Sequence, residues 1–150
     1  MNGRKGQGIS MHDDCIFCKI ATNQLPSYTI YENDNFKIIL DRFPWAAGHT
    51  LIVIKRHAET IFELTPCEGA ELFRLAVIAA KALNEVLNPD GLNVLQNNKE
   101  AAVQSINHFH MHLIPRYKND SIGITFKQGD PPSGEFEKLL ADIKNKFNLQ

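Results

Sequence analysis

Three histidines that alternate with apolar residues carry the strongest chemical signal in the sequence. They are His108, His110 and His112, separated by Phe109 and Met111. Because side chains alternate between the two faces of a β-strand, this spacing predicts three imidazoles on one face and the apolar side chains in the core. A rise of about 3.3 Å per residue puts neighbouring imidazoles roughly 6.6 Å apart, too far to share one proton but close enough for adjoining roles.

Two kinds of chemistry could use this row. Neutral imidazoles on one strand face can bind Zn²⁺, as in zinc enzymes built on strands. Alternatively, a histidine with a pKa near 6.5 is mostly neutral at pH 7, so one ring nitrogen has a lone pair that can attack phosphorus. That reaction requires a fixed tautomer, in which Nδ1 donates its proton to a backbone carbonyl and Nε2 faces outward.

The elements that must position these residues can be predicted from hydrophobic patterns and turn residues. Thr65 at the N-cap, Pro66 at the first position and Glu68 as a capping partner predict a helix that ends near Leu87. Strands are predicted over 29–32, 36–40, 49–54, 92–96 and 107–115, the first two joined as a hairpin, and an amphipathic helix over 136–147. This order predicts an α+β fold on a mainly antiparallel, five-stranded sheet.

The long helix should bury one apolar stripe against the sheet, because its apolar residues recur at spacings of three and four. The predicted stripe consists of Leu72, Leu75, Ala76, Ala79, Leu83 and Val86.

Composition narrows the class of protein. The chain has 150 residues and a formal net charge of -1, so it offers no broad basic surface for nucleic acid, which argues against nucleic-acid binding as its main function. Its longest apolar run is too short to span a membrane, and its start does not resemble a secretory signal. We expect a disordered or vector-derived tail over 1–13, a single domain over 14–150 and a cytoplasmic location.

Together with several further motifs, the alternating histidines resemble the histidine triad (HIT) superfamily. The matching segments cover about residues 14–117 and include 15–20, 48–51, 55–57, 97–98, 104–105 and 114–116. The likeness is greatest to the histidine triad nucleotide-binding branch and its bacterial relatives. This resemblance implies the HIT-like fold and a nucleotide phosphoramidase or nucleotidyl hydrolase acting on a purine nucleoside 5′-monophosphate derivative.

The resemblance also implies roles for single residues. His110 would attack the α-phosphate and form a nucleotidyl-histidine that water hydrolyses, with its Nδ1 proton on the carbonyl of His108. His112 and His49 would flank the phosphate and assist charge and proton transfer. The remaining positions that match the family's nucleotide contacts are Asp41 at the ribose and Asn97, Gln104 and Ser105 on the phosphate side.

Purely structural roles for these polar residues stay open. Asp41 could be only a turn residue at the end of a strand, and Asn97 and Ser105 could be loop caps. The phosphate loop also departs from the family, because many relatives have glycine where this chain has Lys99 and Val103. A β-branched residue resists positive φ, so Val103 predicts a reshaped loop or reduced turnover.

The Cys15-x-x-Cys18 pair supplies half of a tetrahedral zinc site. In some bacterial relatives the same pair binds a structural zinc with the histidines that match His57 and His108. A closed site of this kind stabilises the fold and does not activate water. Redox chemistry is the competing interpretation, but the pair does not follow a strand of a βαβ unit.

Three hypotheses from different classes follow. The first is the nucleotide hydrolase, which the resemblance also implies is a homodimer joined through the 65–87 helix and a sheet edge. The second is a non-catalytic nucleotide-binding or partner-binding module, which the substitutions at Lys99 and Val103 favour. The third is a metal hydrolase that uses the histidine row directly.

Overall fold

The computed structural model describes residues 14–125, 127, 129 and 135–147. The chain divides into two compact units, Met1–Asp120 and Ser121–Gln150, which are described separately. The expected tail over 1–13 lies outside the described residues, and a single domain over 14–150 stays a prediction.

The first unit is built on a five-stranded antiparallel sheet. Its strands run β1(Tyr28–Glu32), β2(Phe36–Leu40), β3(Thr50–Ile54), β4(Gly91–Leu95) and β5(His110–Arg116), in the spatial order β1-β2-β3-β5-β4. Every neighbouring pair is antiparallel. The predicted α+β class and antiparallel sheet are confirmed, and β5, which carries His110 and His112, lies between β3 and β4.

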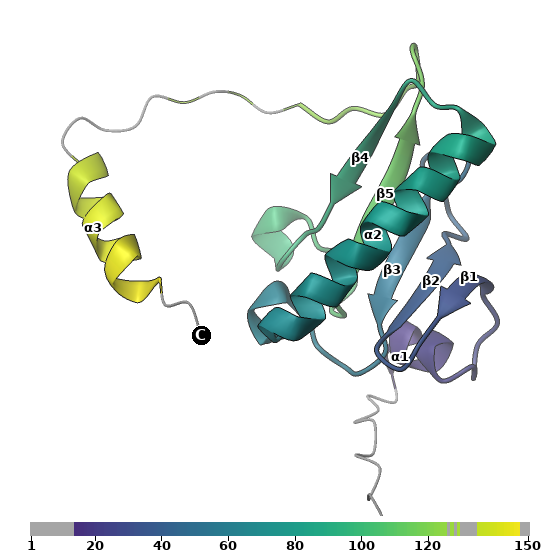
Figure 1. Ribbon diagram of the computed structural model, residues 1–150, viewed down its shortest axis with the longest axis horizontal. Helices are drawn as coiled ribbons and strands as arrows, with labels where there is room; N and C mark the ends of the chain where they lie inside the picture. Colours follow the sequence, from purple (N-terminus) through teal and green to yellow (C-terminus); the bar gives the residue numbers. More distant parts are fainter. Residues whose placement is uncertain (1–13, 126, 128, 130–134, 148–150) are drawn as a thin grey trace, which may run out of the picture. The chain divides into compact units, whose positions relative to one another are not determined.

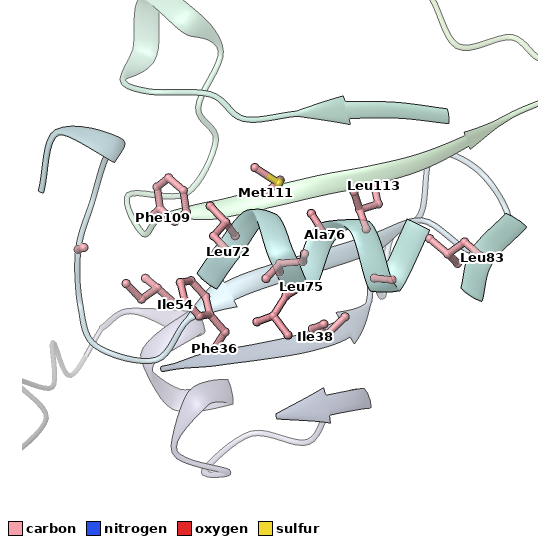
Figure 2. Packing of buried hydrophobic residues seen from close by; sticks show 13 residues of the cluster. Phe36, Ile38, Ile54, Leu72, Leu75, Ala76, Leu83, Phe109, Met111 and Leu113 are labelled. Carbon is pink, nitrogen blue, oxygen red and sulfur yellow. The ribbon is translucent and has the colours of Figure 1, made fainter. Parts of the chain in front are cut away.

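Helix α2(Pro66–Leu87) crosses one face of this sheet (Figure 1). Alternate side chains of β2, β3 and β5 meet it there, and Phe109, Met111 and Leu113 enter this core as predicted (Figure 2). The short helix α1(Ile16–Ala21) belongs to a second cluster, in which Phe17 packs with side chains of β2 and β3 from the other face. The alternation of β5 therefore leaves His110 and His112 on the side of α1.

Local sequence signals account for the main turns and caps. Asn33 closes the β1–β2 hairpin, because its side-chain oxygen accepts hydrogen bonds from the amides of Asn35 and Phe36. The predicted capping box of α2 is present: the Thr65 hydroxyl accepts from the Glu68 amide at 3.2 Å, and the Glu68 carboxylate accepts from the Thr65 amide at 2.8 Å.

Two details of the predicted elements are wrong. The strand predicted over 107–115 begins only at His110, since the amides of His108 and Phe109 bond to Ile106 and Ala58 outside the sheet ladder. Val86, placed on the buried stripe, is 81% exposed. Leu87 packs against the core in its place, because it follows Leu83 by four residues.

Gly48 brings the loop before β3 close to the end of α2. Its φ is +81°, and a Cβ atom there would collide with Cδ1 of Leu87. Glycine alone combines that conformation with the close approach, so it fixes the path of the chain into His49.

In the second unit, α3(Phe136–Lys146) confirms the predicted amphipathic helix. Within the part of the chain that the structure describes, no helix has the length and apolar character needed to cross a membrane.

Candidate functional site

A cavity of about 540 Å³ opens on the side of the sheet that carries α1. Its walls come from α1, the start of β1, the end of β2, the loop 41–45 and segment 105–106. His110 and His112 also line it. The cavity is large enough for a small-molecule ligand, and it combines apolar walls with a few polar groups.

The geometry of His110 fixes its tautomer. Nδ1 of His110 lies 2.7 Å from the backbone carbonyl oxygen of His108, and because a carbonyl can only accept, Nδ1 must carry the proton. Burial lowers the pKa of His110, although the bond to His108 opposes this effect. The ring is therefore neutral at pH 7, and Nε2 keeps its lone pair in a residue that lines the cavity.

His112 forms a pair with His49. Nδ1 of His112 lies 2.9 Å from Nε2 of His49, and both rings are buried. Burial is the main reason that the pKa of His112 falls to about 3, and it also lowers the pKa of His49, which Asp41 partly offsets. The ring centroids of His110 and His112 are 4.8 Å apart, closer than the roughly 6.6 Å expected from strand rise.

The contacts of Asp41 suit both a turn residue and a ligand-binding residue. One carboxylate oxygen accepts a hydrogen bond from the Phe43 amide at 2.9 Å, as in a turn after a strand. The other oxygen lies 3.4 Å from Nδ1 of His49. Asp41 also lines the cavity, so its carboxylate is within reach of a bound ligand.

The other three predicted nucleotide-binding residues lie in or beside the loop before β5, and they differ in position. Ser105 lines the cavity, whereas Asn97 and Gln104 are not among the described residues that do. Asn97 donates to the Val103 carbonyl at 3.3 Å. Gln104 accepts from the Lys99 amide at 2.6 Å and donates to the carbonyls of Glu59 and Ile106. The side chains of Asn97 and Gln104 thus hold the loop itself.

Cys15, Cys18, His57 and His108 come together beside this site. Their ligand atoms all lie within 4.8 Å of one another, including 3.2 Å from Cys15 Sγ to His108 Nδ1 and 3.3 Å from Cys18 Sγ to His57 Nδ1. Nε2 of His108 is 2.7 Å from the Ile54 carbonyl, so it carries the proton and Nδ1 has a lone pair toward the sulfurs. These donors suit a tetrahedral Cys₂His₂ metal site, and the cluster could hold a metal ion.

Comparison with known proteins identifies the family. The family model described as the HIT domain matches residues 22–119. The chain belongs to the HIT family. It is 40% identical over 116 residues to Protein hit of Bacillus subtilis, covering 77% of this chain and 80% of that protein. It is 34% identical over 134 residues to adenosine 5′-monophosphoramidase hnt1 of Schizosaccharomyces pombe, covering 89% of this chain and 98% of that protein.

Solved structures of HIT proteins agree with the fold. SMU.412c from Streptococcus mutans superposes with a TM-score of 0.84 at 37% identity, covering 97% of this chain and 92% of that chain. A Zn-bound histidine triad family protein from Mycobacterium smegmatis gives 0.68 at 33% identity, covering 89% and 98%.

The loop that contains Lys99 and Val103 has two strained residues. Lys99 has φ 68° and ψ 168°, and Val103 has φ 64° and ψ 31°. The first region is essentially restricted to glycine, and the second is strongly unfavourable for a β-branched residue. Hydrogen bonds between the two ends of the loop hold it in this conformation. The Gln104 side chain accepts from the Lys99 amide, and the Lys99 carbonyl accepts from the amides of Ala102 and Gln104.

Sequence reasoning missed the aromatic residues of the cavity. Tyr28, Phe43 and Trp45 line it although their side chains are more than half exposed. The signal was the run Phe43-Pro44-Trp45, where two large aromatic residues stand in a turn outside any periodic pattern. Exposed aromatic residues gathered at a cavity are typical of ligand-binding surfaces.

Proposed function

We propose that this HIT protein is a hydrolase that releases a purine nucleoside 5′-monophosphate from its leaving group through a covalent intermediate on His110. The observation that carries the proposal is the bond from Nδ1 of His110 to the His108 carbonyl, which leaves Nε2 free in a residue that lines the cavity. The name of the fission-yeast relative, adenosine 5′-monophosphoramidase, supports a substrate with a phosphorus–nitrogen bond.

The reaction takes two displacement steps. Nε2 of His110 attacks the α-phosphorus, and the bond to the leaving group breaks with its electron pair on that group, which takes up a proton. Water then attacks the same phosphorus, breaks the P–Nε2 bond and releases a proton to solvent, which balances the proton taken up by the leaving group and gives the nucleoside monophosphate and neutral His110. His112 assists by donating a hydrogen bond to a phosphoryl oxygen, where charge develops in the transition state. His49 supports His112 through the contact between its Nε2 and Nδ1 of His112.

Nucleotide binding uses the polar residues of the cavity. Asp41 accepts from the 2′- and 3′-hydroxyls of the ribose, because it lines the cavity beside the histidines. Ser105 contacts the phosphate. Asn97 and Gln104 contribute by holding the phosphate loop rather than by touching the ligand, since their hydrogen bonds go to the backbone of that region.

A structural Zn²⁺ at Cys15, Cys18, His57 and His108 is part of the proposal. The donor set fits a closed tetrahedral site, in which the metal supplies a cross-link between the start of the chain and the sheet. The metal takes no part in the reaction. Because thiols serve as ligands in this site, the proposal includes a reducing compartment such as the cytoplasm.

The proposal also includes a homodimer. Helix α2 exposes Phe73, Val77 and Ile78 on the surface away from its buried stripe, and their exposed fractions are 50–60%. Strand β4, an edge of the sheet, is more than a third exposed at Val94. A second copy of the chain would cover both features, because unpaired sheet edges and apolar patches favour association.

The experiment is incubation with adenosine and guanosine phosphoramidates and dinucleoside polyphosphates, followed by mass spectrometry of the protein. We expect nucleoside monophosphate to accumulate and a nucleotidyl adduct to form on His110. His110→Asn should lose turnover by at least about 10³-fold and still bind AMP. Met111→Leu is the matched control, because the adjacent side chain packs in the core and the swap conserves volume.

A second function deserves the same test because of the strained phosphate loop. A non-catalytic nucleotide-binding module would bind AMP without hydrolysing any substrate of the panel and without forming an adduct. Turnover above that of His110→Asn excludes it.

A further inference from the structure

The indole of Trp45 lies against both rings of the His49–His112 pair. Its ring centroid is 5.0 Å from that of His49 with an angle of 28° between the planes, and 5.1 Å from that of His112 with an angle of 12°. The two imidazoles are themselves stacked at 5.1 Å. Trp45 is the sole tryptophan of the chain, and it also lines the cavity.

A chain of hydrogen bonds that starts at the Trp45 backbone fixes the tautomers of this pair. The Trp45 amide donates to Nδ1 of His49 at 3.2 Å, and an amide can only donate, so Nδ1 of neutral His49 carries the lone pair and Nε2 the proton. Nε2 of His49 then donates to Nδ1 of His112 at 2.9 Å. The proton of neutral His112 is therefore on Nε2, as a donor in a residue that lines the cavity.

The other groups that face the pair do not hold the rings in this arrangement. Asp41 lies 3.4 Å from Nδ1 of His49, and a carboxylate there favours a proton on Nδ1, the opposite tautomer. The ring of His110 meets His112 edge to face at 4.8 Å and 67°, and its Nδ1 bonds to His108 instead. Among the residues that the structure describes, the stacked indole and the Trp45 amide are the contacts that favour the observed geometry.

A packing role alone does not explain this position. The Trp45 side chain is 52% exposed, whereas His49 and His112 are 1% and 7% exposed. The indole thus lies against two buried histidines and leaves about half of its surface open to solvent at the cavity wall. Stacking of this kind restricts ring rotation and excludes water from the pair.

We propose that Trp45 is a positioning residue, which holds the His49–His112 pair in one tautomer and one orientation so that Nε2–H of His112 points at the phosphoryl group. This inference rests on the proposed function for its consequence in turnover. The effect of Trp45 on the tautomers of the His49–His112 pair can be measured without any substrate.

The test compares Trp45→Phe, Trp45→Leu and Trp45→Ala with the wild type in the full chain. Phenylalanine keeps an aromatic face, leucine keeps bulk without that face, and alanine removes both. With adenosine phosphoramidate as substrate, we expect kcat to fall about tenfold in Trp45→Leu and Trp45→Ala, with KM within about threefold of the wild type. Trp45→Phe should recover most of kcat.

The second readout is the chemical shift of the ring nitrogens of His49 and His112 in ¹⁵N NMR spectra. The wild type and Trp45→Phe should show both rings protonated on Nε2. Without the indole against the rings, the contact from the amide of residue 45 to Nδ1 of His49 loses its fixed geometry, so Trp45→Leu and Trp45→Ala should show averaged shifts from mixed tautomers. Tyr31→Ala is the matched control, because Tyr31 is an exposed aromatic residue on β1 that does not line the cavity, and it should change neither readout.

Each outcome decides the matter. Wild-type kcat together with unchanged tautomers in Trp45→Leu and Trp45→Ala overturns the proposal, and so does an equal loss in Trp45→Phe and Trp45→Ala. If Trp45→Ala does not fold, the pair Trp45→Phe and Trp45→Leu still decides it. If the wild type hydrolyses no substrate, the proposed function fails, and the nitrogen shifts alone then support or overturn control of the pair by Trp45.

Discussion

The carbonyl oxygen of His108 accepts a hydrogen bond from Nδ1 of His110 at 2.7 Å, while the ring of the same His108 faces the sulfurs of Cys15 and Cys18. One residue therefore belongs to two sites: its backbone orients the proposed nucleophile, and its side chain is a ligand of the proposed metal site. The imidazole of His108 is fully buried, so the surrounding packing fixes the position of the ring. Loss of the metal should consequently affect the protein beyond the cluster.

Removal of the proposed metal ligand Cys18 tests this relationship. We expect Cys18→Ser to abolish stoichiometric zinc binding and to lower Tm by about 10 °C, because a structural metal contributes folding free energy directly. Turnover should fall only in part and remain far above that of His110→Asn, since no step uses the metal. Calorimetry, metal analysis and the phosphoramidate assay give the three measurements.

Cys67→Ser is the matched control for that experiment. Cys67 is exposed at the start of α2, outside the cluster, and its replacement should leave metal content and Tm unchanged. Complete loss of turnover on chelation, restored by zinc alone in a folded protein, would instead support the metal hydrolase.

Val103 should be a site of easy stabilisation. Its φ of 64° is unfavourable for a β-branched side chain, and glycine adopts that conformation without strain. We expect Val103→Gly to raise the free energy of unfolding by about 1 kcal/mol, the strain relieved exceeding the entropy that glycine adds to the unfolded chain. Urea denaturation measures the change.

Ala102→Gly provides the comparison for Val103→Gly. Ala102 is the last residue of the short 3₁₀ helix Glu100–Ala102, which Val103 follows, and it has no positive φ, so glycine there should destabilise the protein. Equal effects of the two substitutions would show that backbone strain at Val103 is not what limits this loop.

The buried histidine pair should make the protein sensitive to mild acid. The pKa of His112 is about 3 in the folded state and near 6.5 in an unfolded chain, so the unfolded state binds the extra proton first. The contribution of neutral His112 to the free energy of unfolding is therefore complete above pH 6.5 and is lost as pH falls toward 3. The pKa of His49 is also lowered, which acts in the same direction.

We therefore expect the free energy of unfolding to fall by up to about 1.4 kcal/mol per pH unit for each of these histidines below pH 6. Denaturation series at pH 7.5, 6 and 5 measure the slope. His112→Asn should show a shallower slope than the wild type. A slope that does not change in this variant would mean that His112 is not held neutral by burial.

How much could be predicted from the sequence depends on whether the signal is local. The capping box of α2 and the apolar alternation of β5 involve residues close in the chain, and both appear as predicted. Gln104 shows the opposite case, because its three hydrogen bonds reach the backbone of Lys99, Ile106 and the distant Glu59. Nothing in its neighbours indicates that its amide holds a loop rather than a ligand. Trp45 was missed for the same reason, since its partner His112 lies far along the chain.

The ion pair between Arg56 and Glu68 gives a prediction about folding that is independent of the active site. Two nitrogens of Arg56 donate to the Glu68 carboxylate at 2.6 and 2.9 Å, which joins the segment after β3 to the first turn of α2. These bonds are the main cause that lowers the pKa of Glu68 from 4.5 to about 2, assisted by the Thr65 amide. The stabilisation is therefore present above pH 4.5 and disappears as pH falls toward 2.

Because the pair is partly solvated, Glu68→Gln should cost only about 1–2 kcal/mol at pH 7 and close to nothing near pH 2. Glu85→Gln, on an exposed position of the same helix, should change stability by less than about 0.5 kcal/mol. Urea unfolding of both variants across this pH range measures the difference, and a cost for Glu68→Gln that persists at pH 2 would assign its role to the cap geometry rather than to its charge.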